Sequence, residues 1–305
     1  MGKIAFIYPG QGAQKLGMGE EFYREEQIAK EIYEHASQWI ELDVPALCFS
    51  DNDMLDQTRY TQAAMVTTCL AMTAVVKERG ILPDVTAGLS LGEYAAIVCC
   101  GAMTEKDGIQ LVRKRGLLMD QAVPAGVGAM AAVLGLENQK VASIIEEIEG
   151  VSIANYNCPG QIVITGEIDA VAQGILMLKG VGAKRTVMLN VSGAFHSEML
   201  ADVGLELKHE LEDVELSKLN IPYVSNVTGK YVYDASEIKE LLERQVSSSV
   251  LWEQSMREMI ANGVDTFIEI GPGKTLAGFM KKIDKSVRMF NIQTLSDIDR
   301  VLEEL

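Results

Sequence analysis

The sequence predicts an α/β protein in which a small unit is inserted into a larger domain. The first sign is a Gly-x-Ser-x-Gly pentapeptide, residues 88–92, placed between an apolar strand candidate (85–89) and a helix candidate (93–103). The second sign is the pattern of residues 127–189, which alternates strand-like and helical segments as β-α-β-β-α-β. Six such elements within about 65 residues form the split βαβ, ferredoxin-like order.

The position of this unit in mid-chain predicts the domain organisation. Strand candidates of the large part lie on both sides of it, so neither terminus belongs to the small unit. We therefore expect a discontinuous large domain made of residues 1–125 and 192–305, and a small domain made of residues 126–191.

The large domain opens with an apolar strand candidate at 3–8, which ends at Pro9-Gly10. Residues 20–42 and 62–79 carry apolar positions at helical spacing, and the polar stretch 51–61 between them is a loop or a short helix. The remaining expected elements are, in chain order, a helix at 106–122, strand 127–136, helix 138–148, strands 151–156 and 161–166, helix 168–179, strand 183–189, a helix ending near 212, strand 221–226, helices 238–245 and 255–262, and strand 264–270.

Composition excludes several classes of protein. The 305 residues carry a net charge of −16, which argues against nucleic acid or an anionic membrane as the main partner. No apolar run approaches the roughly 18–20 residues that span a bilayer. The five cysteines are odd in number and lie mostly in apolar surroundings, which indicates buried thiols in a reducing cytoplasm. No paired Cys or His spacing favours a structural zinc site.

The pentapeptide predicts a nucleophile elbow centred on Ser90. Gly88 and Gly92 let strand and helix pass close together, and the serine then lies on a strained turn with its hydroxyl exposed. The backbone N–H of Leu91 at the helix start is free to face a developing oxyanion. The alternative is a strand–helix turn with an incidental serine.

Two glycine-rich loops resemble phosphate-binding loops, but neither has the residues that such a motif requires. The first, 10–14, has neither the dinucleotide spacing nor a following Gly-Lys-Ser/Thr; it is either a tight connection or a loop whose backbone approaches a ligand beside Gln11. The second, 271–275, resembles the end of a P-loop but has Ile268 where the motif requires glycine.

A serine nucleophile needs a base, and the chain has three histidines. His35 and His209 lie on predicted helices among charged residues, whereas His196 lies in a loop just before a helix, where it can line a cleft. A Ser–His couple passes the hydroxyl proton to the imidazole on attack. No Asp or Glu is evident as an orienting group, and serine plus histidine alone fits an esterase equally well.

The motifs above, together with further segments, resemble those of the malonyl-CoA:acyl carrier protein transacylase family. The resemblance extends from Phe6 to about Thr294. The family has an α/β-hydrolase-like large domain with an inserted ferredoxin-like subdomain, which agrees with the element order above. The matching segments are Pro9-Gly10-Gln11-Gly12-Ala13-Gln14, Gly88-Leu89-Ser90-Leu91-Gly92-Glu93, Arg115-Gly116-x-x-Met119, Asn155-Tyr156-Asn157-Cys158-Pro159-Gly160-Gln161, Gly193-Ala194-Phe195-His196 and Glu269-x-Gly271-Pro272-Gly273-Lys274.

The resemblance implies a catalytic group of residues. Ser90 would be the acylated nucleophile and His196 its base, while the backbone N–H groups of Gln11 and Leu91 would form the oxyanion hole.

It also implies a set of substrate-binding residues. Arg115 would pair with the free carboxylate of malonyl through two hydrogen bonds. It is one of three basic residues in a row, and spacing alone does not single it out. Phe195 would narrow the pocket around the malonyl carbon, and Asn155 belongs to the same substrate-binding set.

Two positions depart from the family pattern. The residue before the nucleophile is often histidine in the family and is Leu89 here, which removes a polar group near the site mouth. The residue before Trp252 is often Gln or Arg and is Leu251 here. Its backbone carbonyl is expected to orient the histidine, a role that any residue can fill.

The resemblance therefore implies a cytoplasmic acyltransferase that moves malonyl from CoA to the phosphopantetheine thiol of acyl carrier protein, through a malonyl-serine ester and without a metal or redox cofactor. One alternative is a serine thioesterase or hydrolase, and another is a non-catalytic carrier-protein binding module. Since both enzyme and carrier protein are acidic, docking needs a local basic patch, unless the candidate residues are merely solvated charges. The candidates are Lys184, Arg185, Lys281, Lys282, Lys285 and Arg288.

Overall fold

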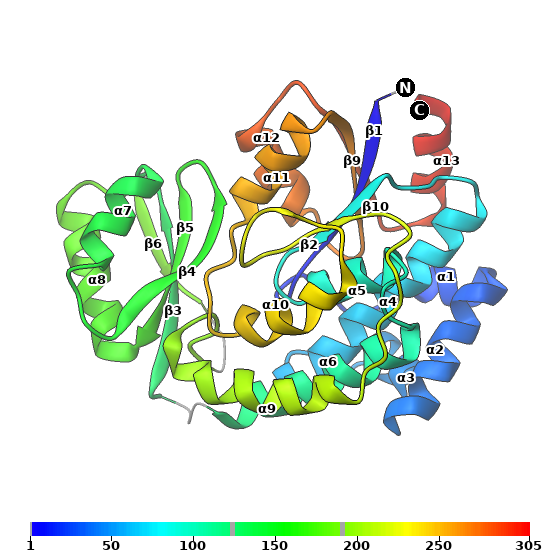
Figure 1. The fold of residues 1–305 in the computed structure, drawn as a ribbon, viewed down its shortest axis with the longest axis horizontal. Helices are drawn as coiled ribbons and strands as arrows, with labels where there is room; N and C mark the ends of the chain where they lie inside the picture. Colours follow the sequence, from blue (N-terminus) through cyan, green and yellow to red (C-terminus); the bar gives the residue numbers. More distant parts are fainter. Residues whose placement is uncertain (1, 123–125, 190–192) are drawn as a thin grey trace.

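The structure, a computed structural model, describes residues 2–122, 126–189 and 193–305. It is a mixed α/β protein with two separate sheets (Figure 1). In the six-stranded sheet the order is β10 (Arg288–Ile292), β9 (Val264–Ile270), β1 (Lys3–Tyr8), β2 (Val85–Gly88), β7 (Tyr223–Val224), β8 (Tyr231–Val232). In the four-stranded sheet it is β4 (Val151–Cys158), β5 (Gln161–Glu167), β3 (Gly128–Leu134), β6 (Arg185–Met188).

The six-stranded sheet is parallel except for the last pair, β7 and β8. Alternate residues of β1 enter different cores: Phe6 and Tyr8 join one buried cluster, and Ala5 and Ile7 join another on the opposite face. A parallel sheet buried on both faces reads as a continuous apolar run, which is why Ala5–Tyr8 has no polar residue.

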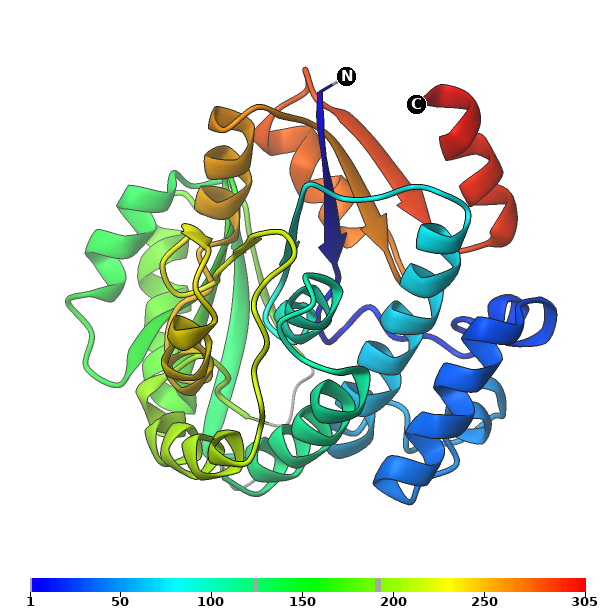
Figure 2. The ribbon, with the colours of Figure 1, turned by 45° about the vertical axis from the view of Figure 1, so that its right-hand side comes forward.

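Helices cover both faces of this sheet, as the two views of Figures 1 and 2 illustrate. One face packs against α4 and α5, with a further helical layer behind them, and the other packs against α11 and α12. The helices outside the small unit are α1 (Glu20–Glu25), α2 (Gln27–Ile40), α3 (Val44–Phe49), α4 (Thr58–Glu78), α5 (Gly92–Cys99), α6 (Glu105–Ala122), α9 (Ala201–Glu212), α10 (Ile238–Gln245), α11 (Trp252–Ala261), α12 (Thr275–Ile283) and α13 (Leu295–Glu304).

The four-stranded sheet is antiparallel throughout. One of its faces is covered by α7 (Asn138–Ile145) and α8 (Ile168–Gly180), and together they form a core of their own. The element order in this part of the chain is β3-α7-β4-β5-α8-β6, as the residue pattern predicts. The other face looks toward the large part of the molecule, and a short bridge between Asn155 and Val250 links the two parts.

The predicted elements are present, with differences at their ends. The helical stretch 20–42 is two helices, because Glu26 takes an extended conformation between α1 and α2. The predicted helix 62–79 begins earlier, at Thr58, inside the stretch left open between loop and helix. Strand β9 and helix α10 have the predicted bounds. Among the described residues, no helix is long and apolar enough to cross a membrane.

Candidate active site

Ser90 lies on the turn between β2 and α5, the strand–turn–helix arrangement that the pentapeptide predicts. Its φ of 52° is in the left-handed region, which costs a non-glycine residue about 1–2 kcal/mol. A Cβ on Gly88 would lie 1.9 Å from the carbonyl carbon of Gly92, and one on Gly92 would lie 2.3 Å from the carbonyl oxygen of Tyr8. Both glycines are therefore required for the close passage of strand and helix.

His196 lies directly against the nucleophile. Its Nε2 is 2.6 Å from Ser90 Oγ, and its Nδ1 is 2.9 Å from the carbonyl oxygen of Gln245 and 3.1 Å from that of Ser248. Because carbonyl oxygens only accept, the proton of the neutral ring belongs on Nδ1, which leaves Nε2 to accept from the Ser90 hydroxyl. Burial, with the positive charge of Arg115 as the next cause, lowers the pKa of His196 to about 4. The ring is thus a neutral base at physiological pH.

The expectation that Leu251 supplies the orienting carbonyl is wrong. The carbonyl oxygen of Leu251 accepts hydrogen bonds from the backbone N–H and the hydroxyl of Ser255, at 2.9 and 2.8 Å. Gln245 and Ser248, at and just beyond the end of α10, provide the carbonyls instead. Every residue carries a carbonyl, so nothing in the sequence distinguishes which one faces the ring.

Arg115 is buried on α6, with 1% of its surface exposed, below the nucleophile. Its terminal nitrogens donate to Gln62 Oε1 at 2.8 Å and Gln245 Oε1 at 3.2 Å, and one lies 3.5 Å from Ser90 Oγ. Burial lowers the pKa of the guanidinium, an effect that Tyr94 and Glu93 oppose.

The guanidinium of Arg115 is only partly satisfied. Within the described part of the chain its Nε has no hydrogen-bond partner, and no carboxylate is close enough to form an ion pair with it. Its neighbours in the basic run are engaged elsewhere: the guanidinium of Arg113 lies over the Tyr60 ring, and Lys114 pairs with Glu210. A buried cation without a counter-charge beside a nucleophile can receive a substrate carboxylate.

The loop after β1 lies against the elbow. A Cβ on Gly10 would be 2.6 Å from the carbonyl oxygen of Leu89, so only glycine permits this contact. The Gln11 side chain donates to Thr58 Oγ1 at 2.9 Å. Among the described residues, the backbone N–H groups of Gln11 and Leu91 have no protein acceptor, which is the condition that an oxyanion hole requires.

These residues surround one cavity of about 440 Å³ between the two sheets. Gln11, Ser90, Asn155, Phe195 and His196 line it, while Arg115 and Leu91 lie buried behind its wall. The small unit contributes the free face of its sheet through the lining residues Met130, Ala132, Asn155, Asn157, Gln161 and Val163.

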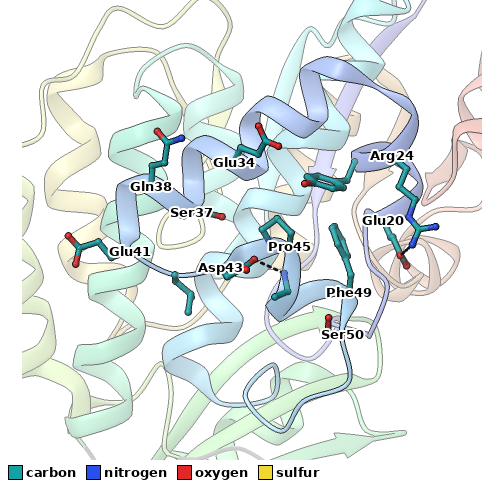
Figure 3. A pocket seen from close by; sticks show the side chains of 13 residues that line it. Glu20, Arg24, Glu34, Ser37, Gln38, Glu41, Asp43, Pro45, Phe49 and Ser50 are labelled. Atoms are coloured by element: carbon teal, nitrogen blue, oxygen red, sulfur yellow. Dashed lines mark hydrogen bonds and ion pairs between the residues drawn. The ribbon is translucent and has the colours of Figure 1, made fainter.

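A larger hollow of about 950 Å³ lies elsewhere, between α1, α2 and α3 (Figure 3). Four of its thirteen lining residues are acidic, and one of them, Asp43, caps α3 by accepting from the N–H of Ala46 at 2.8 Å. None of its described lining residues is a histidine or a cysteine, and Glu34, Gln38 and Glu41 point out of the helix toward solvent in Figure 3. The site with chemistry is the smaller cavity.

Four buried residues of the site were not predicted: Gln62, Glu93, Asn226 and Gln245. Side-chain hydrogen bonds from Asn226 and Gln245 hold the backbone of Ser90, and those from Gln62 and Gln245 hold the guanidinium of Arg115. The carboxylate of Glu93 accepts from Gln245 and from the backbone of Asn226. Only Glu93 stands in a sequence motif, and the others lie far from their partners along the chain. Of the described residues, no group of three or more His, Cys, Asp or Glu side chains is arranged to hold a metal ion.

Comparisons with known proteins first give the class. The family model described as "Acyl transferase domain" matches residues 5–296, nearly the whole chain. Curated relatives then give the particular family. The malonyl CoA-acyl carrier protein transacylase of Bacillus subtilis (strain 168) is 42% identical over 310 residues, covering 100% of this chain and 98% of the relative. That of Staphylococcus aureus (strain MRSA252) is 40% identical over 303 residues, covering 98% of each.

Solved structures agree. The transacylase of Clostridium perfringens superposes with a TM-score of 0.96 at 42% identity, covering 99% of this chain and 96% of the other. A malonyl-transacylase solved in complex with a type II PKS acyl-carrier protein gives a TM-score of 0.96 at 34% identity, covering 99% of this chain and 100% of that one. The chain belongs to the malonyl CoA-acyl carrier protein transacylase family, as the motifs predict.

Proposed function

We propose that this protein transfers malonyl from malonyl-CoA to the phosphopantetheine thiol of acyl carrier protein through a malonyl ester of Ser90. The observation that carries the proposal is the buried Arg115 guanidinium, which has no carboxylate partner in the described part of the chain and lies 3.5 Å from the Ser90 hydroxyl. Malonyl is an acyl group with a carboxylate two bonds from its carbonyl carbon, so it can pair with this cation while its thioester faces Ser90.

In the first half-reaction, His196 Nε2 takes the proton of Ser90 as Oγ attacks the thioester carbonyl carbon. The oxyanion that forms accepts from the N–H groups of Gln11 and Leu91. The C–S bond then breaks, and the CoA sulfur leaves with the proton from His196. Malonyl remains on Ser90 as an ester.

In the second half-reaction, the carrier-protein thiol gives its proton to His196, and its sulfur attacks the ester carbonyl. The C–O bond to Ser90 breaks, and the serine oxygen recovers the proton from His196. Atoms and charges balance without a metal or redox partner.

Two further residues shape the acyl site. Phe195, which lines the cavity beside His196, would limit the space around the malonyl carbon. Asn155 lines the same cavity from β4, where its amide can hydrogen-bond the substrate. Leu89, where the family often has histidine, also lines the cavity and gives its mouth an apolar wall.

The finer description of the fold belongs to the same proposal. We infer an α/β-hydrolase-like catalytic domain (1–125 and 192–305) with an inserted ferredoxin-like subdomain (126–191). The elbow after a parallel strand supports the first, and the antiparallel order β4-β5-β3-β6 with two helices on one face supports the second. Both proposed boundaries fall at residues 123–125 and 190–192, which lie outside the described residues.

A cytoplasmic location is proposed on the state of the thiols. All five cysteines are free and buried in the structure, and burial raises the pKa of Cys48 to about 12 and that of Cys158 to about 11. Such unpaired, protonated thiols suit a reducing compartment.

The alternative function is hydrolysis, in which water replaces the carrier thiol. The family relationship supports transfer, and the carboxylate at His196 that a hydrolase triad usually has is replaced by backbone carbonyls. A burst of CoA release equal to the enzyme present, without continued turnover, is expected when malonyl-CoA is the only substrate.

The test is the intact mass of the protein after mixing with malonyl-CoA. Wild type should gain one malonyl group, lose it when holo acyl carrier protein is added, and gain little from acetyl-CoA. Ser90→Ala should gain none, because Ser90 supplies the one hydroxyl that is hydrogen-bonded to His196 among the described residues. A malonyl adduct that persists on Ser90→Ala would overturn the assignment of the nucleophile.

A further inference from the structure

The backbone N–H and the backbone carbonyl of Ser90 are both hydrogen-bonded to side chains from distant parts of the chain. The Ser90 N–H donates to Asn226 Oδ1 at 2.6 Å, and the Ser90 carbonyl accepts from Gln245 Nε2 at 2.9 Å. A left-handed backbone persists only where its surroundings hold it in place. Asn226 and Gln245 are therefore the two clamps of the elbow.

The orientation of each clamp is fixed by what lies at its other end. Asn226 donates its Nδ2 to the carbonyl of Gly88 at 2.7 Å, so its oxygen must face Ser90. Gln245 accepts from Arg115 through Oε1 at 3.2 Å, so its NH₂ must face Ser90. Turning either amide over would oppose donor with donor and acceptor with acceptor.

Both clamps meet at one buried carboxylate, Glu93, which lies in the first turn of α5 and is 1% exposed. Its Oε2 accepts from Gln245 Nε2 at 2.6 Å, and its Oε1 accepts from the backbone N–H of Asn226 at 3.2 Å. Since both partners are donors, an ionised carboxylate satisfies both at once. An amide offers only one acceptor atom, and a protonated acid accepts more weakly and carries a hydrogen that needs an acceptor of its own.

Glu93 also compensates the charge of Arg115 without pairing with it. The Gln245 amide lies between them, accepting from the guanidinium and donating to the carboxylate. Burial raises the pKa of Glu93 to about 7, an effect that its hydrogen bonds and the positive charge of Arg115 oppose, so the carboxylate is ionised above neutral pH. Burial lowers the pKa of Arg115, and the negative charge of Glu93 is one of the effects that oppose this. One interposed amide keeps the guanidinium available for a substrate carboxylate.

We propose that Glu93 is a positioning residue, which acts through Asn226 and Gln245 to hold the Ser90 peptide and the Arg115 guanidinium in the geometry for malonyl transfer. The proposal rests on the function proposed above. Glu93 touches neither substrate nor the reacting atoms; its effect passes through the two clamps.

The variant that tests this is Glu93→Gln, which keeps shape and removes the charge and one acceptor. In single-turnover experiments we expect its acylation by malonyl-CoA to slow by about ten- to a hundredfold, the range of one lost charge-assisted contact in a site. We also expect the ratio of kcat/KM for malonyl-CoA over acetyl-CoA to fall, because Gln245 no longer holds Arg115 against a fixed carboxylate. Glu93→Asp keeps the charge on a side chain that is one methylene shorter. Its acylation rate and its malonyl-to-acetyl ratio should lie between those of wild type and Glu93→Gln.

A chemically matched control is Glu269→Gln. Glu269 is likewise a buried carboxylate that accepts two hydrogen bonds, in its case from the backbone N–H groups of Leu276 and Ala277. In the described structure it has no hydrogen bond to either clamp or to Arg115. It should lower the melting temperature while leaving the malonyl-to-acetyl ratio unchanged. If Glu93→Gln fails to fold, Glu93→Asp carries the same test.

The outcomes separate the two proposals. A wild-type enzyme that never forms the malonyl-Ser90 ester would overturn the proposed function itself. A wild type that forms it normally, with Glu93→Gln or Glu93→Asp matching it in both acylation rate and malonyl-to-acetyl ratio, would overturn the role of Glu93 alone. A lowered melting temperature with unchanged rate and ratio would do the same, since it marks a purely structural residue.

Discussion

Arg115 separates this site from that of a general esterase. Its guanidinium sits on two glutamine oxygens with no carboxylate partner, so an acyl group without a carboxylate leaves the charge poorly compensated. Charge-assisted hydrogen bonds are each worth about 1.5–3 kcal/mol, so a pair discriminates by roughly two to four decades at about 1.4 kcal/mol per decade.

The prediction concerns Arg115→Ala and Arg115→Lys. The ratio of kcat/KM for malonyl-CoA over acetyl-CoA should fall steeply in the alanine variant, and by an intermediate amount in the lysine variant, which keeps charge but not the planar fork. Steady-state kinetics with both substrates measure it. An unchanged ratio in Arg115→Ala would mean that the carboxylate is recognised elsewhere.

At the residue scale, the protonation of His196 should also make the reactivity of Ser90 depend on pH. With a pKa of about 4, below the ordinary 6.5, the ring stays neutral as pH falls through 6 and becomes protonated only near 4. A protonated Nε2 cannot accept from Ser90, so in Glu93→Gln, which removes the carboxylate whose pKa burial raises to about 7, reactivity should be flat from neutral pH to about 5 and fall tenfold per pH unit below about 4. In wild type, protonation of Glu93 should add a separate fall near pH 7.

The rate at which a neutral fluorophosphonate modifies Ser90 measures this reactivity at each pH. The reagent has no carboxylate that would itself titrate between about pH 4 and 7. Circular dichroism at each pH should show that the fold persists. Arg115→Ala should move the midpoint upward, because the positive charge of Arg115 contributes to lowering the pKa. A midpoint near 6.5 in Glu93→Gln would contradict the buried, neutral base described here.

At the scale of elements, a glycine in α5 and a glycine in α12 should respond in opposite ways to substitution by alanine. Gly92 begins α5 against the backbone of β1, where a Cβ would lie 2.3 Å from the Tyr8 carbonyl oxygen. Gly278 lies inside α12, is exposed, and has nothing within 4 Å of the place of a Cβ. The first position tolerates only glycine, whereas the second carries the entropic cost of glycine in a helix.

Gly92→Ala should destabilise the protein by about 3 kcal/mol or more, since overpacking against backbone cannot be relieved by a side-chain movement. Gly278→Ala should stabilise it by about 0.5–1 kcal/mol. Urea unfolding of the two variants beside wild type measures both. A stabilised Gly92→Ala would contradict the close approach of elbow and strand.

Element prediction succeeded where local pattern and tertiary structure agree, and missed elements that depend on partners. Strand β9 lies between the turn residues Gly263 and Gly271, and its predicted bounds are those observed. Helix α3 spans only six residues, too few for an apolar period, and strand β8 has two residues that exist as a strand only by pairing with β7. Strand β10 and helices α12 and α13 follow the last predicted strand and were not assigned.

At the scale of the whole molecule, the sequence predicts the site residues that lie in motifs. It does not predict the residues that hold them in place. Ser90 and His196 stand 106 positions apart in recognisable segments, and the structure places them 2.6 Å apart. Gln245 reaches Ser90 across 155 positions as part of an ordinary amphipathic helix, with no local mark of its role. Backbone carbonyls carry no sequence signal at all, which is why the orienting group of His196 was assigned to the wrong residue.

Carrier-protein docking also belongs to the whole molecule, because the net charge of −16 opposes an acidic partner at long range. Among the candidate cations, Arg288 donates to Thr266 and to the carbonyl of Glu304, away from the cavity. Lys282 instead donates to Gln161, a cavity-lining residue, at 3.2 Å, and shares helix α12 with Lys281 and the cavity-lining Phe279. Lys281 and Lys282 are thus cations on a helix that borders the cavity.

Charge reversal of both, Lys281→Glu with Lys282→Glu, should raise the KM for acyl carrier protein by about tenfold at low salt and by less at high salt, where screening weakens the contact. The burst of CoA release from malonyl-CoA should be unchanged, because acylation precedes docking. The matched control is Lys106→Glu with Lys218→Glu, two exposed lysines that do not line the cavity and that change net charge equally. If both pairs raise KM equally, the effect comes from overall charge. If neither does, the carrier protein approaches the cavity by another face.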